Sequence, residues 1–204
     1  HGSDYYLHTY ADTKNNQNYP ERNTLIRFNL PSLGNNYTIR STSLTLYYAG
    51  YDDLDSGDMV EVDVYKVRSW ANWTQSGANW NTINGSTYWH SPYGCEDDVY
   101  DRYPDLAAWY SFYRSTPFGD KVFIQHLNKL DDIVRSWYSG DTNNGLVLRV
   151  ASHYNGQEGV YFYSNNYGNN WGPRLTINYT NLPVAEANGP YTATYGHDVT
   201  FSGV

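Results

Sequence analysis

The sequence predicts an all-β protein, a jelly-roll β-sandwich with one short α-helix. Apolar and polar residues alternate along many short segments, each flanked by Gly, Asn, Asp or Pro, as in strands with one buried face. A single segment has helical spacing instead. Aromatic residues make up 18% of the chain and include 23 Tyr, so rings as well as aliphatic side chains are expected to fill the core. An all-β region of this length with irregular loops favours a jelly roll over a small barrel.

The predicted strands follow one another along most of the chain. Each places β-branched or aromatic residues at alternate positions, as Ile26, Phe28 and Leu30 do, and such residues fit a pleated, half-buried surface. The predicted strands are residues 23–30, 43–48, 59–67, 120–127, 145–152, 159–164 and 174–180.

The predicted helix covers about residues 128–139. Asn128 is expected to cap its start, Asp131 and Asp132 suit the positive end of the helix dipole, and Gly140 is expected to end it. Its apolar stripe consists of Leu130, Ile133, Val134 and Trp137. A lone helix among strands is expected to cover one opening of the sandwich.

A change of composition after Tyr179 predicts a domain boundary. Residues 4–180 are expected to form one module, 181–183 a linker, and 184–204 the start of a second domain with a new Gly-Pro turn and a new alternating run. The first three residues, His1-Gly2-Ser3, read as the remnant of an expression tag.

Charge and motifs argue against several classes of function. The net charge is −8 with Lys and Arg scattered singly, which argues against nucleic acid and anionic membrane surfaces as partners. No apolar run reaches about 18 residues, so no membrane insertion is expected. Cys95 is the single cysteine, which excludes an intrachain disulfide, and we expect a buried or incidental thiol. Neither HExxH, G-x-S-x-G nor a phosphate-binding Gly loop is present, so we expect no enzyme activity from these residues.

Several stretches in order resemble a known family. They are NTLIRFNLP (23–31), STSLTLYY (41–48), VEVDVYKVRSW (60–70), NWN (79–81), the helical segment ending at Trp137, NNGLVLRV (143–150), VYFYSNN (160–166) and GPRLTINY (172–179). This order resembles the DNRLRE-type domain, or disaggregatase-related repeat, of microbial and especially archaeal methanogen surface proteins. The tail ANGPYTATYGHDVTFSG (187–203) resembles the opening of a PKD domain, an immunoglobulin-like module.

The resemblance implies a secreted, non-catalytic, carbohydrate-associated jelly roll at the cell surface, attached to larger exported proteins and next to PKD-like domains. The chain departs from the family pattern at Asn165-Asn166, where an acidic residue is frequent, and in a long insertion over residues 88–117. The family has two Trp positions that Trp70 and Trp80 match, and the resemblance implies that both are packing residues.

The segment SWANWTQSGANWNTINGSTYW (69–89) holds four of the seven Trp residues. Trp73 and Trp89 have no counterpart in the family pattern and lie among polar residues. Two interpretations stay open for this pair. Either both rings are exposed and stack on the C–H faces of a pyranose, or both are buried as core.

A second aromatic and polar cluster lies in YFYSNNYGNNWGPR (161–174). Its predicted ligand-binding residues are Tyr161, Tyr163, Tyr167, Trp171 and Arg174. The two strand tyrosines are expected to point outward, opposite Val160 and Phe162, while amides and the guanidinium can bind sugar hydroxyls. The alternative is an ordinary strand surface followed by turn chemistry.

The loop YDDLDSGD (51–58) gathers four carboxylates, Asp52, Asp53, Asp55 and Asp58. Oxygen ligands on one loop suit a structural Ca²⁺, although the spacing is not that of an EF-hand. A solvated acidic turn is the alternative.

These observations predict an extracellular carbohydrate-binding module that contacts an envelope or matrix polysaccharide through aromatic loops. A structural spacer or adhesion module without sugar binding is the alternative. A polysaccharide-degrading enzyme is a third, less favoured hypothesis, because paired carboxylates across a cleft are not recognisable in the sequence.

Overall fold

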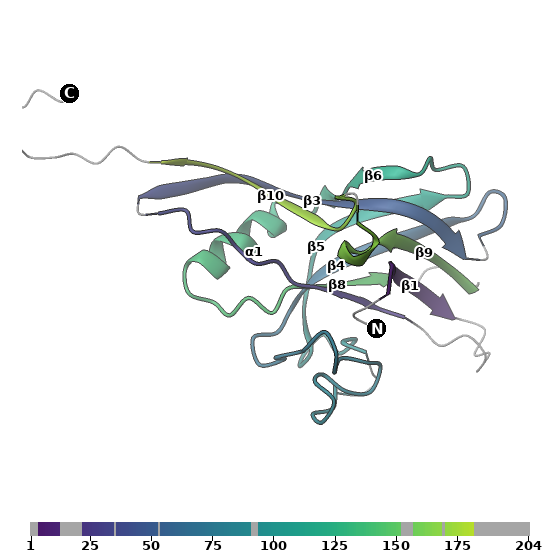
Figure 1. The fold of residues 1–204 in the computed structure, drawn as a ribbon, viewed down its shortest axis with the longest axis horizontal. Helices are drawn as coiled ribbons and strands as arrows, with labels where there is room; N and C mark the ends of the chain where they lie inside the picture. The colour runs from purple at the N-terminus through teal and green to yellow at the C-terminus, as the bar shows by residue number, and fades with distance from the viewer. Residues whose placement is uncertain are drawn as a thin grey trace, which may run out of the picture.

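A computed structural model describes residues 4–12, 22–34, 36–52, 54–90, 94–151, 157–168 and 170–181. Two antiparallel sheets pack face to face, and neither closes into a barrel over these residues (Figure 1). The first sheet contains β1 (Tyr6–Asp12), β9 (Gln157–Tyr163), β3 (Tyr37–Asp52), β10 (Arg174–Asn181) and β6 (Gly119–Val122). The second contains β2 (Thr24–Ile26), β8 (Leu146–Val150), β4 (Met59–Val67), β5 (Arg102–Tyr113) and β7 (Ile124–Gln125). The predicted all-β sandwich with one short helix is confirmed.

The core lies between the two sheets, as the alternation predicts. The inward side chains of the first sheet are Leu44, Leu46, Tyr48, Val160 and Phe162, and those facing them include Val60, Val62, Val64, Phe112 and Leu148. All of these are fully buried. The rings contact one another across the interface, with centroids 4.8 Å apart for Tyr48 and Phe112 and 5.5 Å apart for Phe112 and Phe162. Aromatic contacts therefore join the two layers.

The predicted strands differ from the observed ones in several ways. Strand β3 extends well beyond the predicted 43–48 at both ends. The segment 120–127 forms two strands, because the chain leaves β3 of the first sheet after β6 and pairs with β5 of the second sheet as β7. The strand predicted over 23–30 contains only the three residues of β2. Strands β1 and β5 were not predicted. Pro104 lies inside β5, whose register against β4 shifts twice, as expected where proline and bulges interrupt a ladder.

Helix α1 (Lys129–Tyr138) covers one end of the sandwich, where its apolar stripe packs into the core beside β3 and β5 (Figure 1). The prediction that Asn128 caps the helix is wrong, since Asn128 has φ +60° and its side chain makes no capping hydrogen bond. The Gln125 side chain accepts from the Asp131 amide instead. The predicted end at Gly140 is right: Gly140 has φ +110° and the Asp141 amide donates to the Ser136 carbonyl, as in a Schellman ending.

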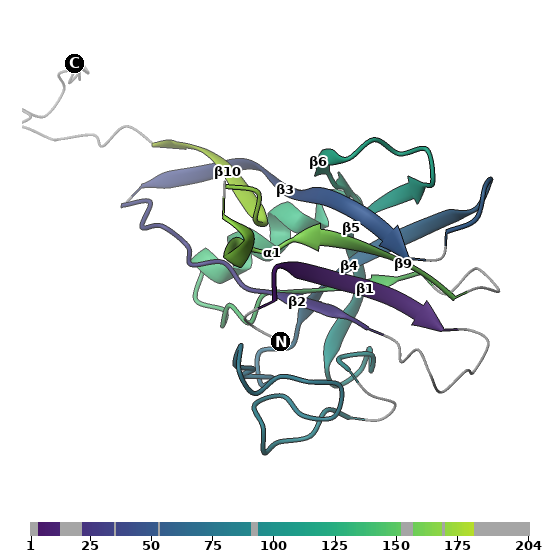
Figure 2. The ribbon, with the colours of Figure 1, turned by 45° about the vertical axis from the view of Figure 1, so that its right-hand side comes forward.

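Residues 68–90 and 94–101 form a separate layer that we call the cap. It covers the outer face of the second sheet, since Val147 contacts it while its neighbours Leu146 and Leu148 point into the main core. The cap has its own small core, made of Ala71, Trp73, Ile83, Trp89 and Cys95 against Val67 and Val147. In Figures 1 and 2 the cap lies below the two sheets.

Alkaline pH is expected to destabilise the fold through Tyr48. Burial, with smaller contributions from Tyr51 and Tyr161, raises the Tyr48 pKa to about 12, against about 10 in an unfolded chain. The protonated phenol is therefore favoured by folding. Its contribution is complete below pH 10 and is lost as the pH rises toward 12, by about 1.4 kcal/mol per pH unit.

The Tyr48→Phe variant tests this expectation in urea titrations from pH 8 to 12. The Tyr48 hydroxyl has no hydrogen-bond partner among the described residues, so the variant is expected to be as stable as the wild type below pH 10. Above pH 10 its free energy of unfolding is expected to fall less steeply. Equal slopes for the two proteins would contradict the assignment.

Candidate functional site

The loop between β9 and β10 connects two strands that pair with the same edge of β3. Thr45 pairs with both Val122 of β6 and Arg174 of β10, while Tyr48 pairs with both Gly119 of β6 and Phe162 of β9. Because a strand has two edges and β6 occupies one of them, β9 and β10 share the other, one after the other. Residues 164–173 therefore leave this edge and return to it.

Aromatic side chains gather where this loop meets the outer face of the first sheet. We call them the aromatic row, consisting of Tyr47, Trp171, Tyr167, Tyr163, Tyr6 and Tyr161. Along the row, successive ring centroids are 4.8, 5.4, 3.8, 5.3 and 5.2 Å apart. The first pairs are close to parallel, with interplanar angles of 20° for Tyr47 and Trp171 and 17° for Trp171 and Tyr167. Three strands, β1, β3 and β9, and the loop that follows β9 thus supply the rings of the row. Figure 2 shows these three strands next to one another.

Strand register places the four rings of the row that belong to β1, β3 and β9. Tyr6 lies directly opposite Tyr163 in the pairing of β1 with β9, and His8 lies opposite Tyr161, which makes them cross-strand pairs on one face. Val160 and Phe162 point into the core, as predicted for the opposite face. The Tyr161 ring lies over Gly50, where a Cβ atom would come within 2.2 Å of the phenol oxygen. Glycine at position 50 therefore makes room for the ring.

Local hydrogen bonds and close contacts place the other two rings, Tyr167 and Trp171. Ser164 accepts from the Asn166 amide and donates to the Asp4 carbonyl, and this holds the short 3₁₀ helix η1 (Asn165–Tyr167) against the chain before β1. A Cβ atom on Gly172 would come within 1.8 Å of Asn165 Oδ1. The loop is therefore closed by close contacts that fix Tyr167 and Trp171.

Polar contacts border the row at both ends. Arg174 pairs with Asp120, which lies opposite Tyr47 in the sheet, and Arg174 Nη1 donates to the Asn170 carbonyl at 3.0 Å. At the other end His8 Nδ1 lies 3.5 Å from Asp52 Oδ2. The contact with His8 holds the pKa of Asp52 below its usual value. A hydrogen bond with Tyr167, followed by burial, raises the pKa of Tyr163. The row therefore lies between two polar ends.

The predicted site residues divide into two groups. The structure brings Tyr161, Tyr163, Tyr167 and Trp171 together in the aromatic row, with Arg174 beside it. It places Trp73 and Trp89 in the cap, on the other sheet. Sequence reasoning missed Tyr6 and His8, because β1 was not predicted, and Tyr47, which looked like one more outward strand residue.

Of the two interpretations open for Trp73 and Trp89, the structure shows burial, which contradicts a ligand-binding role for either ring. Their exposed fractions are 7% and 5%. Trp73 Nε1 donates to the Asn144 carbonyl at 2.7 Å and Trp89 Nε1 donates to the Asn79 carbonyl at 2.9 Å. Both rings are needed because the polar cap has few other apolar side chains with which to build a core, and backbone carbonyls satisfy both indole N–H groups.

The resemblance implied that Trp70 is a packing residue, but its side chain is 42% exposed, so this expectation is wrong. The Trp80 ring is partly buried and lies over Gly94, where a Cβ atom would be 2.7 Å from it. Trp80 therefore has the packing position that the resemblance implied.

The acidic loop 51–58 does not gather its carboxylates in the described residues. Asp52 is turned toward His8, and the Asp58 amide donates to the Asp55 carbonyl across a turn that contains Gly57 at φ +98°. Asp53 lies outside the described residues. No group of three or more His, Cys, Asp or Glu side chains suited to a metal occurs in the described part of the chain. The described acidic side chains thus do not fit a calcium cage, and Ca²⁺ stays a prediction from sequence.

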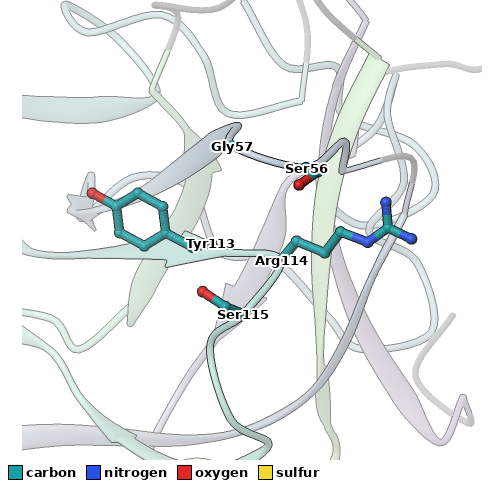
Figure 3. A pocket seen from close by; sticks show the side chains of 5 residues that line it. All are labelled: Ser56, Gly57, Tyr113, Arg114 and Ser115. Atoms are coloured by element: carbon teal, nitrogen blue, oxygen red, sulfur yellow. The ribbon is translucent and has the colours of Figure 1, made fainter.

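A hollow of about 300 Å³ lies beside this loop, between Ser56, Gly57, Tyr113, Arg114 and Ser115 (Figure 3). Figure 3 shows the Tyr113 ring and the Arg114 guanidinium pointing away from each other. The guanidinium disfavours a cation here, and none of the predicted site residues lines the hollow. We assign it no role in binding.

Cys95 is fully buried, as expected for a thiol without a catalytic role, and burial raises its pKa.

Comparisons of the chain with protein-family models, curated proteins and solved structures find no match. The resemblance to the DNRLRE-type domain stays a prediction. Among the described residues no helix is long and apolar enough to span a membrane. Strand β10 extends to Asn181, and the rest of the predicted linker and PKD-like segment, residues 182–204, lies outside the described residues.

Proposed function

We propose that this chain is a non-catalytic carbohydrate-binding module of an exported protein, and that the aromatic row contacts an envelope or matrix polysaccharide. The observation that carries the proposal is the row itself: six rings held on one sheet face by strand register and a tightly closed loop. Partly exposed rings in a fixed array lose little conformational entropy on binding. They offer apolar surface to sugar C–H groups and hydroxyls to sugar oxygens.

The polar ends of the row suit a saccharide chain lying along it. Phenol hydroxyls and the Arg174 guanidinium are hydrogen-bonding groups near the rings. The DNRLRE-like order of motifs and the PKD-like tail support an extracellular, cell-surface location, with further PKD-like domains as neighbours in the same protein. Archaeal origin is part of the same proposal.

Affinity gel electrophoresis tests the proposal. Gels contain xylan, galactomannan, β-glucan, chondroitin or polygalacturonate, and the wild type is expected to be retarded in at least one of them. The variant Trp171→Ala is expected to bind at least about tenfold more weakly, because it removes a ring that contacts three others in the row.

The matched control is Tyr179→Ala, which removes an exposed ring of the same sheet outside the row. It is expected to bind as the wild type does. If Trp171→Ala is folded by circular dichroism and its retardation equals that of the wild type, the aromatic row is not the site. A wild type that no gel retards contradicts the proposed function.

A second candidate function, a structural spacer or adhesion module without sugar binding, is favoured by two observations. Trp73 and Trp89 are buried, as this alternative requires. Rings of the row also cover one another, so part of their area anchors the loop 164–173 instead of facing solvent. The gel experiment separates the two functions, since a spacer is retarded in none of the gels.

A further inference from the structure

Three rings of the cap form a second exposed aromatic cluster, which we call the cap cluster: Trp70, His90 and Tyr100. The His90 and Tyr100 rings stack at 4.6 Å and 19°, and the Trp70 ring meets His90 edge-on at 5.0 Å and 89°. Trp70 is 42% exposed and Tyr100 is 54% exposed. The small core of the cap contains Trp73 and Trp89 but none of these three side chains. Packing inside the cap does not account for them.

Hydrogen bonds hold the cluster in one geometry. Trp70 Nε1 donates to the Tyr100 carbonyl. The Asp97 carboxylate accepts from the amides of Val99 and Tyr100, both at 2.8 Å. This turn fixes the backbone of Tyr100, while the indole is fixed by its own hydrogen bond. Such ordering of exposed rings reduces the entropy that a ligand would otherwise have to remove on binding.

Asp101 orients the imidazole. Its side chain is fully buried, and Oδ1 lies 3.2 Å from both the His90 amide and His90 Nδ1. A carboxylate only accepts hydrogen bonds, so Nδ1 carries the proton and Nε2 is the acceptor of the neutral ring. Asp101 Oδ2 has no hydrogen-bond partner among the described residues. Burying a carboxylate with one unpaired oxygen costs free energy of folding. We take its hold on the half-exposed imidazole as a sign that the orientation of the ring serves binding.

The geometry points to a second saccharide contact at the cap cluster, for an uncharged pyranose. The exposed rings supply apolar surface for the C–H groups of the sugar, and His90 Nε2 accepts from one of its hydroxyls. The acidic side chains of the same turn, Asp97 and Asp98, disfavour a uronate or a sulfate there. This inference rests on the proposed function, since it names a second site for the same class of ligand.

The two sites lie on opposite faces of the sandwich. The aromatic row is on the outer face of the first sheet, and the cap covers the outer face of the second. One polysaccharide strand cannot contact both faces without turning around the module. A protein with both sites is therefore bivalent and joins neighbouring strands, which a single-site module cannot do.

Turbidity of protein–polysaccharide mixtures tests the inference, with the five polysaccharides named above. The wild type is expected to produce turbidity with the polysaccharide that retards it. Tyr100→Ala, which keeps the carbonyl that Trp70 binds, is expected to abolish turbidity while affinity-gel retardation falls less than about tenfold. Tyr100→Leu keeps apolar bulk without a ring and is expected to behave in the same way. Tyr88→Ala, an exposed cap ring outside the cluster, is the control and should remain turbid.

Failure of the inference differs from failure of the proposed function. If Tyr100→Ala and Tyr100→Leu, folded by circular dichroism, produce the turbidity of the wild type, the cap cluster is not a saccharide site and the aromatic row is unaffected. If the wild type is retarded by a polysaccharide and produces no turbidity with it, bivalency is overturned. If no polysaccharide retards the wild type, both proposals are overturned together.

Discussion

Replacement of Trp73 by alanine is expected to lower the free energy of unfolding by about 3–5 kcal/mol. Trp73 supplies one of the two indole rings of the small cap core, where it packs among the other cap residues and Val147 of the sheet. The change leaves a cavity, and it also leaves the Asn144 carbonyl without the indole N–H that donates to it at 2.7 Å. Urea denaturation at pH 7, followed by circular dichroism, measures the loss.

Two controls separate the ring from its hydrogen bond. Trp73→Phe keeps a ring but removes the donor, and a smaller loss of about 1–2 kcal/mol is expected. Tyr88→Ala removes a ring that is 71% exposed in the same cap and is expected to change stability by no more than about 0.5 kcal/mol. Hydrogen exchange should locate the loss of protection in the cap. Unchanged stability of Trp73→Ala would mean that the cap does not depend on this core.

The variant Asp131→Ala is expected to lose about 3 kcal/mol of stability. The backbone pairing of β6 with β3 ends near Leu44. At Thr42, farther along this edge of β3, side chains make the hydrogen bonds to the backbone instead. Asp131 Oδ1 accepts from Thr42 N and Thr42 Oγ1, both at 2.7 Å, and Gln125 Nε2 donates to the Thr42 carbonyl at 2.7 Å. Alanine would leave two buried donors without an acceptor.

The neighbouring carboxylate is the matched control. Asp132 lies in the same first turn of α1, is largely exposed and pairs with Arg135 at the surface. Asp132→Ala is expected to cost no more than about 0.5 kcal/mol. Both variants are measured by urea denaturation at pH 7. Equal losses would indicate that the helix dipole, and not the hydrogen bonds to Thr42, accounts for the effect of Asp131.

Elements whose apolar residues repeat regularly along the sequence were predicted well. Strand β4 was predicted with the observed ends, because Val60, Val62 and Val64 repeat at the period of a strand and all face one core. The apolar stripe of α1 was predicted because its buried residues repeat at the period of a helix and face the same core. Strand β5 was not, because Pro104 and two register shifts hide its alternation. The prediction that Asn128 is the N-cap residue of α1 was also wrong. Asn128 is left-handed and the Gln125 side chain takes its place, and both depend on how the preceding strand approaches the helix.

The candidate sites show the same division. Tyr161 and Tyr163 were placed outward correctly, because Val160 and Phe162 determine which face of the strand is buried. That Tyr6 and Tyr47 join them follows from pairings between strands far apart in the sequence. Polar neighbours left open whether Trp73 and Trp89 are exposed, whereas the cap folds those neighbours outward and the rings inward.

The sequence by itself determined that this protein is a β-sandwich with a ring-rich core and a short helix, because alternation and helical spacing record which side of each segment is apolar. Only the tertiary structure decided which tryptophans are buried and which rings form one surface. Burial of a loop side chain and contact between distant strands depend on long-range pairing, which no local pattern contains.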